Sequence, residues 1–266
     1  MQGRLLPKYK GRFQAHPLGY WQDEFPIAEE IGLQCIEFIF DFNDYHLNPL
    51  WTVDGLKEIQ DISKDTGVNV HSVCADFFME CPFHSERQDE SDLAVLVAKK
   101  LIQNCSEHGI SDIVIPCVDQ SSLRNSSDID GFTNQILKVI PLAEKFGVNL
   151  ALETDLDPHA FKNLLEELNS PSITVNYDTG NSASLGFDYL EELQAYGDRI
   201  SDLHIKDRLR GGDSVTLGTG DFDIEGFFSK FDLDQFNGPV ILQCFRDDEG
   251  IALFQNQLNY FSSKIR

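Results

Sequence analysis

Short apolar runs alternate with longer amphipathic segments along most of the chain. The runs are rich in β-branched residues and are bounded by polar or glycine-containing sequence: residues 35–40, 69–75, 112–118, 149–153, 173–178, 200–206 and 239–245. Apolar runs of this length without strict alternation are typical of strands that are buried on both faces. We therefore expect a β-strand in each of them.

The segments between these runs carry the start and stop signals of helices. Thr52 precedes "VDGLKEIQDISKDTG" and Asp157 precedes "PHAFKNLLEELN", while Gly67 and Gly147 stand where such helices should end. Ser, Thr and Asp are preferred helix N-caps, and glycine is preferred just past the last turn. Repeated alternation of strand and helix predicts a parallel sheet with helices outside it.

The number of strand and helix units favours one closed (β/α)₈ TIM barrel over an open sheet. An eighth strand is expected at the very beginning, where "MQGRLL" resembles the tail of a strand limited to Met1–Leu5, which leaves open a natural start upstream. No linker or change in composition interrupts residues 1–266, so we expect a single domain. The longest irregular stretches, residues 41–51, 76–90 and 207–223, follow strands and should lie on the catalytic face of such a barrel.

The charge balance narrows the classes of partner. The chain has 44 acidic and 21 basic residues, a formal net charge of −23, and no block of Lys or Arg. Nucleic acids and anionic membranes both require a positive surface, so neither is expected as a partner. The polar start lacks the apolar segment of a signal peptide, and no apolar run is long enough to cross a bilayer, so we expect a cytoplasmic protein.

Polar side chains stand near the ends of the last four predicted strands. They are Glu153, Asp178, His204 and Gln243. Each has an ordinary structural explanation when taken alone, such as capping the next helix. In a barrel, however, the four strand ends lie on one side of the mouth, and two carboxylates, an imidazole and an amide oxygen can bind Mn²⁺, Mg²⁺, Co²⁺ or Zn²⁺.

Gln243 is unusual because it interrupts an apolar strand in "VILQCFRDD". A buried amide without a hydrogen-bonding partner costs about 1–3 kcal/mol, so this side chain needs a partner or a metal. We expect its oxygen to complete the metal site.

Four phrases carry a family resemblance: "LALETD", "VNYDTGNSASLG", "DLHIKDR" and "LGTGDFDIEGFF". In this order they resemble the xylose isomerase-like TIM-barrel superfamily, and most of all its sugar-phosphate isomerase/epimerase branch. The resemblance implies a metal-dependent enzyme that isomerises or epimerises a small carbohydrate by moving a proton next to a carbonyl. It also implies that Glu153, Asp178 and His204 bind the metal.

The fourth ligand is where this chain departs from the family. Enzymes of this kind usually have a second glutamate there, so that two carboxylates face opposite sides of the substrate, whereas this chain has Gln243. An amide cannot carry the proton, so Glu153 remains as the base, with water, Lys206 or His71 as candidate catalytic partners.

Further residues are candidates for substrate binding. Glu37 stands on the strand where a glutamate recurs in the family, and Asn181 follows the candidate ligand Asp178. Arg208, Arg210 and Arg246 follow the last two strands, where barrel enzymes often bind phosphate. If the substrate is phosphorylated, we expect one or more of them to contact it.

Three alternatives stay open. A lyase of the inosose dehydratase type needs only one firm carboxylate base, which suits Gln243. A nuclease like endonuclease IV needs more histidines and a basic groove, and the charge of −23 argues against it. A non-catalytic sugar-binding barrel is the third, and a homo-oligomer is compatible with the sequence in every case.

Overall fold

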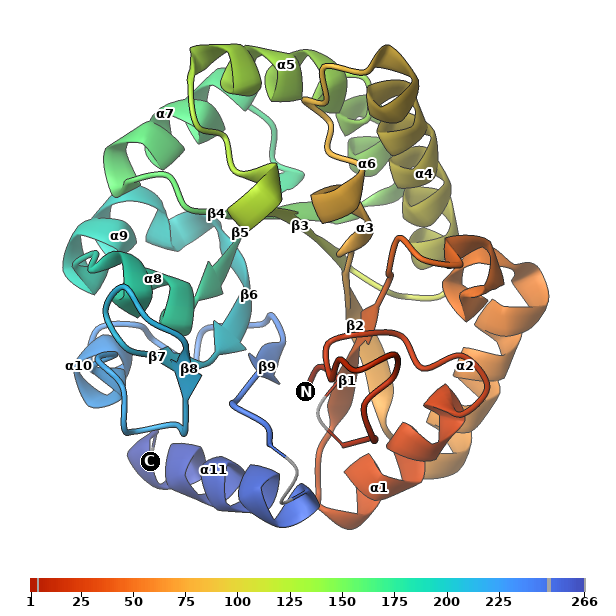
Figure 1. Ribbon diagram of the computed structural model, residues 1–266, viewed down its shortest axis with the longest axis vertical. Coiled ribbons are helices and arrows are strands. Elements are labelled where there is room, and N and C mark those ends of the chain that lie inside the picture. The colour runs from red at the N-terminus through yellow and green to blue at the C-terminus, as the bar shows by residue number, and fades with distance from the viewer. Residues whose placement is uncertain (4, 248–249, 266) are drawn as a thin grey trace.

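The computed structural model describes residues 1–3, 5–247 and 250–265. Their strands form a nearly closed parallel barrel in the order β1-β2-β3-β4-β5-β6-β9, surrounded by helices (Figure 1). Every apolar run that predicts a strand contains one. The strands are β1 (Cys35–Ile39), β2 (Asn69–Cys74), β3 (Asp112–Cys117), β4 (Asn149–Thr154), β5 (Ile173–Asp178), β6 (Ile200–Ile205) and β9 (Val240–Leu242). The predicted barrel class is confirmed.

Helices connect consecutive strands around the outside. The α-helices are α1 (Glu24–Glu30), α2 (Val53–Thr66), α3 (Phe77–Glu80), α4 (Gln88–Glu107), α5 (Ser126–Ile136), α6 (Ile140–Phe146), α7 (Pro158–Leu168), α8 (Thr179–Leu185), α9 (Tyr189–Tyr196), α10 (Ile224–Phe228) and α11 (Ile251–Lys264). Short 3₁₀ helices are η1 (Trp21–Asp23), η2 (Tyr45–Leu47), η3 (Pro49–Trp51), η4 (Asp119–Ser121) and η5 (Gly197–Arg199). In the described residues, no helix combines the length and apolar character that a membrane span requires.

The predicted helix boundaries follow from local hydrogen bonds. The Thr52 hydroxyl accepts from the Gly55 amide at the start of α2, and the Asp157 carboxylate caps α7. Gly67 and Gly147 end α2 and α6 with φ angles of 72° and 66°. Residues with a Cβ are disfavoured in this left-handed conformation, which explains glycine at both positions.

The first strand is less regular than predicted. The described part of residues 1–5 forms no strand ladder, and Arg4 lies outside the described residues. The Met1 amino group nevertheless donates to Cys35 O (3.0 Å), Glu37 N donates to Met1 O (2.8 Å), and Gln2 N donates to Leu242 O (3.4 Å). The chain start therefore lies in the seam between β1 and β9, as Figure 1 shows.

The irregular stretch after β6 is organised by one buried carboxylate. Strands β7 (Asp207–Arg208) and β8 (Ser214–Val215) form a small antiparallel ribbon. Asp207 accepts hydrogen bonds from Gly218 N and Gly220 N (both 2.9 Å) and from Phe222 N (3.2 Å). A Cβ on Gly220 would lie 2.2 Å from Asp207 Oδ1, so only glycine fits this turn. Asp207 therefore holds the "GTGDF" segment in place.

Candidate active site and metal centre

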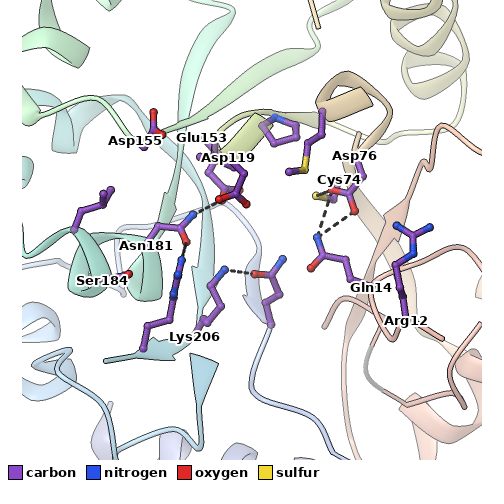
Figure 2. Close-up of a pocket in the computed structure, with 16 residues that line it drawn as sticks. Arg12, Gln14, Cys74, Asp76, Asp119, Glu153, Asp155, Asn181, Ser184 and Lys206 are labelled. Atoms are coloured by element: carbon purple, nitrogen blue, oxygen red, sulfur yellow. Dashed lines mark hydrogen bonds between the residues drawn. The ribbon is translucent and has the colours of Figure 1, made fainter. Parts of the chain in front are cut away.

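A cavity of about 440 Å³ opens at the carboxyl ends of the strands. Its lining includes residues at or just beyond the ends of β2, β3, β4, β6 and β9, namely Cys74, Pro116, Glu153, Lys206 and Gln243. Figure 2 shows Arg12, Gln14 and Asp76 on one side of it, and Asn181, Ser184 and Lys206 on the opposite side. This volume suits a small organic ligand.

Three of the predicted metal ligands converge beside this cavity. Asp178 and His204 are paired in register on β5 and β6, and Glu153 lies on the adjacent β4. The Nδ1 atom of His204 lies 3.6 Å from Glu153 Oε2 and 3.9 Å from Asp178 Oδ2. One candidate ligand atom from each residue lies within 4.8 Å of the other two, and all three residues are buried.

Asp178 uses its two carboxylate oxygens differently. Oδ1 accepts a hydrogen bond from Asn181 N (2.8 Å) and so caps helix α8. Oδ2 is buried, accepts no well-aligned hydrogen bond among the described residues, and lies 2.7 Å from the Lys206 ammonium. The ordinary explanation of a strand-end aspartate, helix capping, thus accounts for one oxygen and leaves the other facing the cluster.

Glu37, inside the barrel, orients the imidazole of His204. His204 Nε2 lies 2.7 Å from Glu37 Oε1, and Glu37 Oε2 accepts a hydrogen bond from Ser72 Oγ (2.7 Å). Burial favours the neutral form of both residues, but their mutual attraction outweighs it, so the pKa of Glu37 is lowered and that of His204 is raised. Pairing Nε2 with a carboxylate turns Nδ1 toward Glu153 and Asp178.

Two amides hold the Glu153 carboxylate. Asn176 Nδ2 donates to Oε2 (2.9 Å), and Asn181 Nδ2 donates to Oε1 (2.5 Å). Burial, and then the neighbouring Asp178, raise the pKa of Glu153 to about 7, although His204 and Lys206 oppose the shift. A carboxylate with this pKa can both accept and release a proton near neutral pH.

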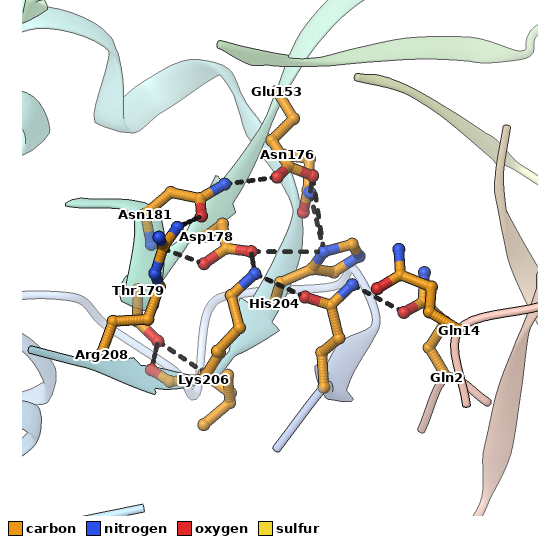
Figure 3. Close-up of polar contacts among 12 residues, drawn as sticks. Gln2, Gln14, Glu153, Asn176, Asp178, Thr179, Asn181, His204, Lys206 and Arg208 are labelled. Carbon is orange, nitrogen blue, oxygen red and sulfur yellow. Dashed lines mark hydrogen bonds and ion pairs between the residues drawn. The ribbon is translucent and has the colours of Figure 1, made fainter. Parts of the chain in front are cut away.

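Lys206 connects Asp178 with Gln243, and Figure 3 shows the Lys206 ammonium beside Asp178. Its Nζ lies 2.7 Å from Asp178 Oδ2 and donates to Gln243 Oε1 (2.8 Å). Its backbone N–H donates to Thr179 Oγ1 (2.9 Å), and its side-chain stem lies so close to Gly180 that a Cβ there would be 2.7 Å from Lys206 Cγ. The ammonium is therefore held at a fixed place on the rim of the cluster.

The Gln243 amide has a partner at each end. Its oxygen accepts from Lys206, and its Nε2 donates to Gln2 Oε1 (2.6 Å), at the other end of the chain. The buried amide is thus satisfied without a metal.

The donor set still fits a divalent ion. Two carboxylates and one imidazole are common ligands of Mn²⁺, Zn²⁺ and Co²⁺. Asp178 Oδ2, which pairs with the Lys206 ammonium (2.7 Å), and His204 Nδ1, which contacts Asn176 Nδ2 (3.0 Å), are two of the donor atoms that such an ion would take over. A second group, Glu37, Asp202 and His204, is also close enough together. There, burial and the nearby Glu37 raise the pKa of Asp202 well above its ordinary value, which favours a protonated carboxyl over a ligand.

The profile of the family described as "Xylose isomerase-like TIM barrel" matches residues 25–264. The chain belongs to this family. The L-ribulose-5-phosphate 3-epimerase of Salmonella heidelberg is 24% identical over 237 residues, which cover 85% of this chain and 83% of that enzyme.

Solved structures show the same barrel. The 3-keto-D-glucoside 4-epimerase from E. coli has a TM-score of 0.74 and 15% identity, and the match covers 98% of each chain. The IolI protein, solved with a bound zinc atom, has a TM-score of 0.72 and 17% identity over 92% of this chain and 93% of its own. At these identities the likeness establishes the fold alone.

The other predicted site residues differ in whether they line the cavity. Arg208 lines the cavity, whereas Arg210 and Arg246 do not. The guanidinium of Arg210 packs against Gly186, and that of Arg246 stacks over the Phe13 ring with its Cζ 4.8 Å from the centroid. The three arginines therefore form no common phosphate-binding cluster.

His71 and Glu37 do not line the cavity. Side chains alternate along β2, and because Ser72 points inward to Glu37, His71 points outward and is exposed. This direction separates His71 from Glu153 and argues against its predicted catalytic role. Glu37 points into the barrel beneath His204, where it orients the imidazole rather than meeting a ligand in the cavity.

Several site residues escaped the sequence reasoning. Asn176 precedes Asp178 by two residues, so strand alternation alone places it on the same inward face. Arg12, Gln14 and Asp76 come from irregular segments and carry no comparable signal.

Proposed function

We propose that this chain is a divalent-metal-dependent isomerase or epimerase that moves a proton beside the carbonyl of a small sugar or sugar phosphate. The observation that carries the proposal is the convergence of Glu153, Asp178 and His204, all buried, beside a cavity of sugar size. Family membership and the likeness to sugar epimerases support the same reaction class.

Glu153 is the proposed base. Its pKa of about 7 allows it to accept a proton from a carbon acid and to return one. The two amides of Asn176 and Asn181 fix the plane of its carboxylate, so the proton-accepting oxygens keep one direction. Such fixed positioning is a large part of the catalytic effect of a general base.

Lys206 is the proposed proton carrier on the side where the family usually has its second glutamate. Gln243 cannot carry a proton, but its oxygen directs the Lys206 ammonium to the edge of the same cavity. An ammonium at this place can donate a proton or stabilise negative charge on a substrate oxygen. The proposed pair is thus Glu153 with Lys206 rather than two glutamates.

Glu153, Asp178 and His204 would hold the metal, which when bound supplies a Lewis acid that polarises a carbonyl oxygen. A role for Gln243 as fourth ligand requires its oxygen to exchange Lys206 for the ion. His204 would keep Nδ1 toward the ion through its contact with Glu37.

Two measurements on the purified protein test this proposal. Calorimetric titration with Mn²⁺ should show one site in the wild type, weakened at least about tenfold in His204→Ala. Proton NMR in D₂O should show deuterium entering ketoses beside the carbonyl only when metal is present, with Glu153→Gln inactive. Glu166→Gln on the exposed face of α7 is the matched control and should behave as the wild type. Wild-type exchange rates in Glu153→Gln would contradict the assigned base.

A lyase of the inosose dehydratase type is the second candidate, and the amide of Gln243 favours it. Removal of an α-proton followed by loss of a β-hydroxyl needs one firm carboxylate base, and Glu153 is the carboxylate that lies between Asn176 and Asn181 in the cavity. Incubation with keto-inositols and with ketoses distinguishes the two reactions. A dehydrated product identifies the lyase, and an epimeric ketose identifies the epimerase.

A further inference from the structure

We infer that the substrate of this site is an uncharged ketose or keto-sugar and not its phosphate ester. This inference rests on the proposed function and makes its substrate class specific. It rests on the hydrogen bonds and ion pairs that the cationic side chains around the cavity make within the protein, and on the carboxyl groups that also line the cavity.

Arg208, one of the two arginines in the cavity wall, already donates to protein acceptors. Arg208 Nη1 donates to Asn181 Oδ1 (3.0 Å), and its Nε and Nη2 both donate to Gly212 O (3.0 and 2.9 Å). The two guanidinium N–H groups that would bind a phosphate in bidentate fashion thus point to a backbone carbonyl. Arg208 braces Asn181, which in turn holds Glu153.

The remaining cations of the lining also have anionic partners. Arg12 Nη2 lies 2.9 Å from Asp41 Oδ2, and Lys206 Nζ lies 2.7 Å from Asp178 Oδ2. A phosphate dianion bound to either cation would also come close to that carboxylate. The repulsion between the two anions would offset part of the attraction to the cation.

Among the described residues, the cavity lining contains the cations Arg12, Lys206 and Arg208, and the acids Asp76, Asp119, Glu153 and Asp155. Burial raises the pKa of Asp76 and Glu153, so repulsion of an anionic substrate is assigned to Asp119 and Asp155. Asp119 is exposed at the rim and Asp155 accepts a hydrogen bond from Ser122 Oγ, so both are placed to repel an anionic substrate.

The side chains that line the cavity are suited to hydrogen bonding with sugar hydroxyl groups. Carboxylate and amide oxygens accept hydrogen bonds from sugar hydroxyls, and the lining contains the amides of Gln14, Asn181 and Gln243 beside its carboxyl groups. A cavity of about 440 Å³ lined in this way can bind a polyhydroxylated ligand through neutral and charge-assisted hydrogen bonds.

Paired substrates test the inference. L-Ribulose and L-ribulose 5-phosphate, and D-fructose and D-fructose 6-phosphate, are compared in D₂O with Mn²⁺ present. The exchange of the proton beside the carbonyl is followed by NMR. We expect kcat/KM to be at least about tenfold higher for the free sugar of a pair that reacts. A higher kcat/KM for the ester would overturn the inference, while its exchange would still support the proposed function.

Charge variants provide a second readout. Asp119→Asn combined with Asp155→Asn should shift the ratio of ester to free-sugar kcat/KM toward the ester by about threefold. Asp65→Asn, exposed on the outer face of α2, is the matched control and should leave the ratio unchanged. An unchanged ratio in the double variant would count against repulsion by the lining.

Calorimetry separates the two proposals if neither sugar exchanges its proton. Tighter binding of the free sugar would then support the inference, although the proposed reaction would have failed. Tighter binding of the ester, or binding of neither, would overturn it.

Discussion

Asp76 lines the cavity in a setting that disfavours its charge. Burial raises the pKa of this carboxyl to about 6, although hydrogen bonds from Cys74 Sγ (3.2 Å) and Gln14 Nε2 (3.1 Å) oppose the shift. The folded state therefore favours the protonated form more than the unfolded chain does, since the unfolded chain ionises at its ordinary pKa. Replacing Asp76 by asparagine should stabilise the metal-free protein at neutral pH.

The magnitude follows from the two pKa values. The difference between about 6 in the folded state and the ordinary 3.8 corresponds to about 3 kcal/mol. Because the folded pKa is the higher one, this contribution to the free energy of unfolding is fully present below pH 3.8. It is lost as the pH rises through about 6. Asp76→Asn cannot ionise, so it should keep this stability at high pH.

Asparagine also fits the local hydrogen bonds. Its Oδ1 can still accept from Cys74, and the Gln14 amide can turn over to offer its oxygen to the new NH₂ group. The substitution therefore changes the ionisation with little change in packing.

Urea unfolding of metal-free protein at about pH 4 and about pH 7.5 measures the effect. Asp76→Asn and the wild type should be close in stability at the lower pH. The variant should be more stable by up to about 3 kcal/mol at the higher pH. Asp65→Asn on the surface of α2 controls for the loss of one negative charge in an acidic chain. A variant that is less stable than the wild type at pH 7.5, or equally shifted at both pH values, would refute the reasoning.

Three further predictions concern neighbouring residues. Glu153, with its pKa raised to about 7, should add to the loss of metal-free stability as the pH rises from 4.5 toward 7, and Glu153→Gln should flatten the unfolding free energy there. Gln243→Glu should tighten Mn²⁺ binding at least about tenfold in calorimetry, since a carboxylate is a better ligand than an amide. An unchanged affinity would show that the residue at position 243 does not bind the metal. Asp207→Asn should lower the free energy of unfolding by about 2–4 kcal/mol, because one amide oxygen cannot satisfy three backbone N–H groups. Hydrogen exchange at the Gly218 and Gly220 amides should become faster in this variant, and unchanged protection of these amides would contradict the prediction.

The sequence was sufficient for the barrel and for three residues of the cluster. Uninterrupted β-branched runs identify strands that are buried on both faces, and polar residues at their ends stand out against the apolar residues that precede them. Glu153, Asp178 and His204 were found in this way, and the structure brings them together.

The partners of these residues depend on contacts that no local pattern records. Gln243 hydrogen bonds to Gln2 across a sequence separation of 241 residues, and its oxygen faces Lys206 from a neighbouring strand. The direction of His71 required knowledge that Ser72 meets Glu37 inside the barrel. Such pairings are fixed by the closure of the sheet, which sequence spacing does not encode.

Asp207 also bears on which positions distinguish the members of this family from one another. Its carboxylate and the glycines of the "GTGDF" segment form a self-contained turn beside the reacting groups. A shared Gly-x-Gly phrase therefore reports that a protein builds this turn, whatever compound it converts. Under the proposed function, side chains at positions 153, 206 and 243 would report on proton transfer instead. Sorting relatives by those three positions, rather than by the phrases that align most easily, should group them by reaction.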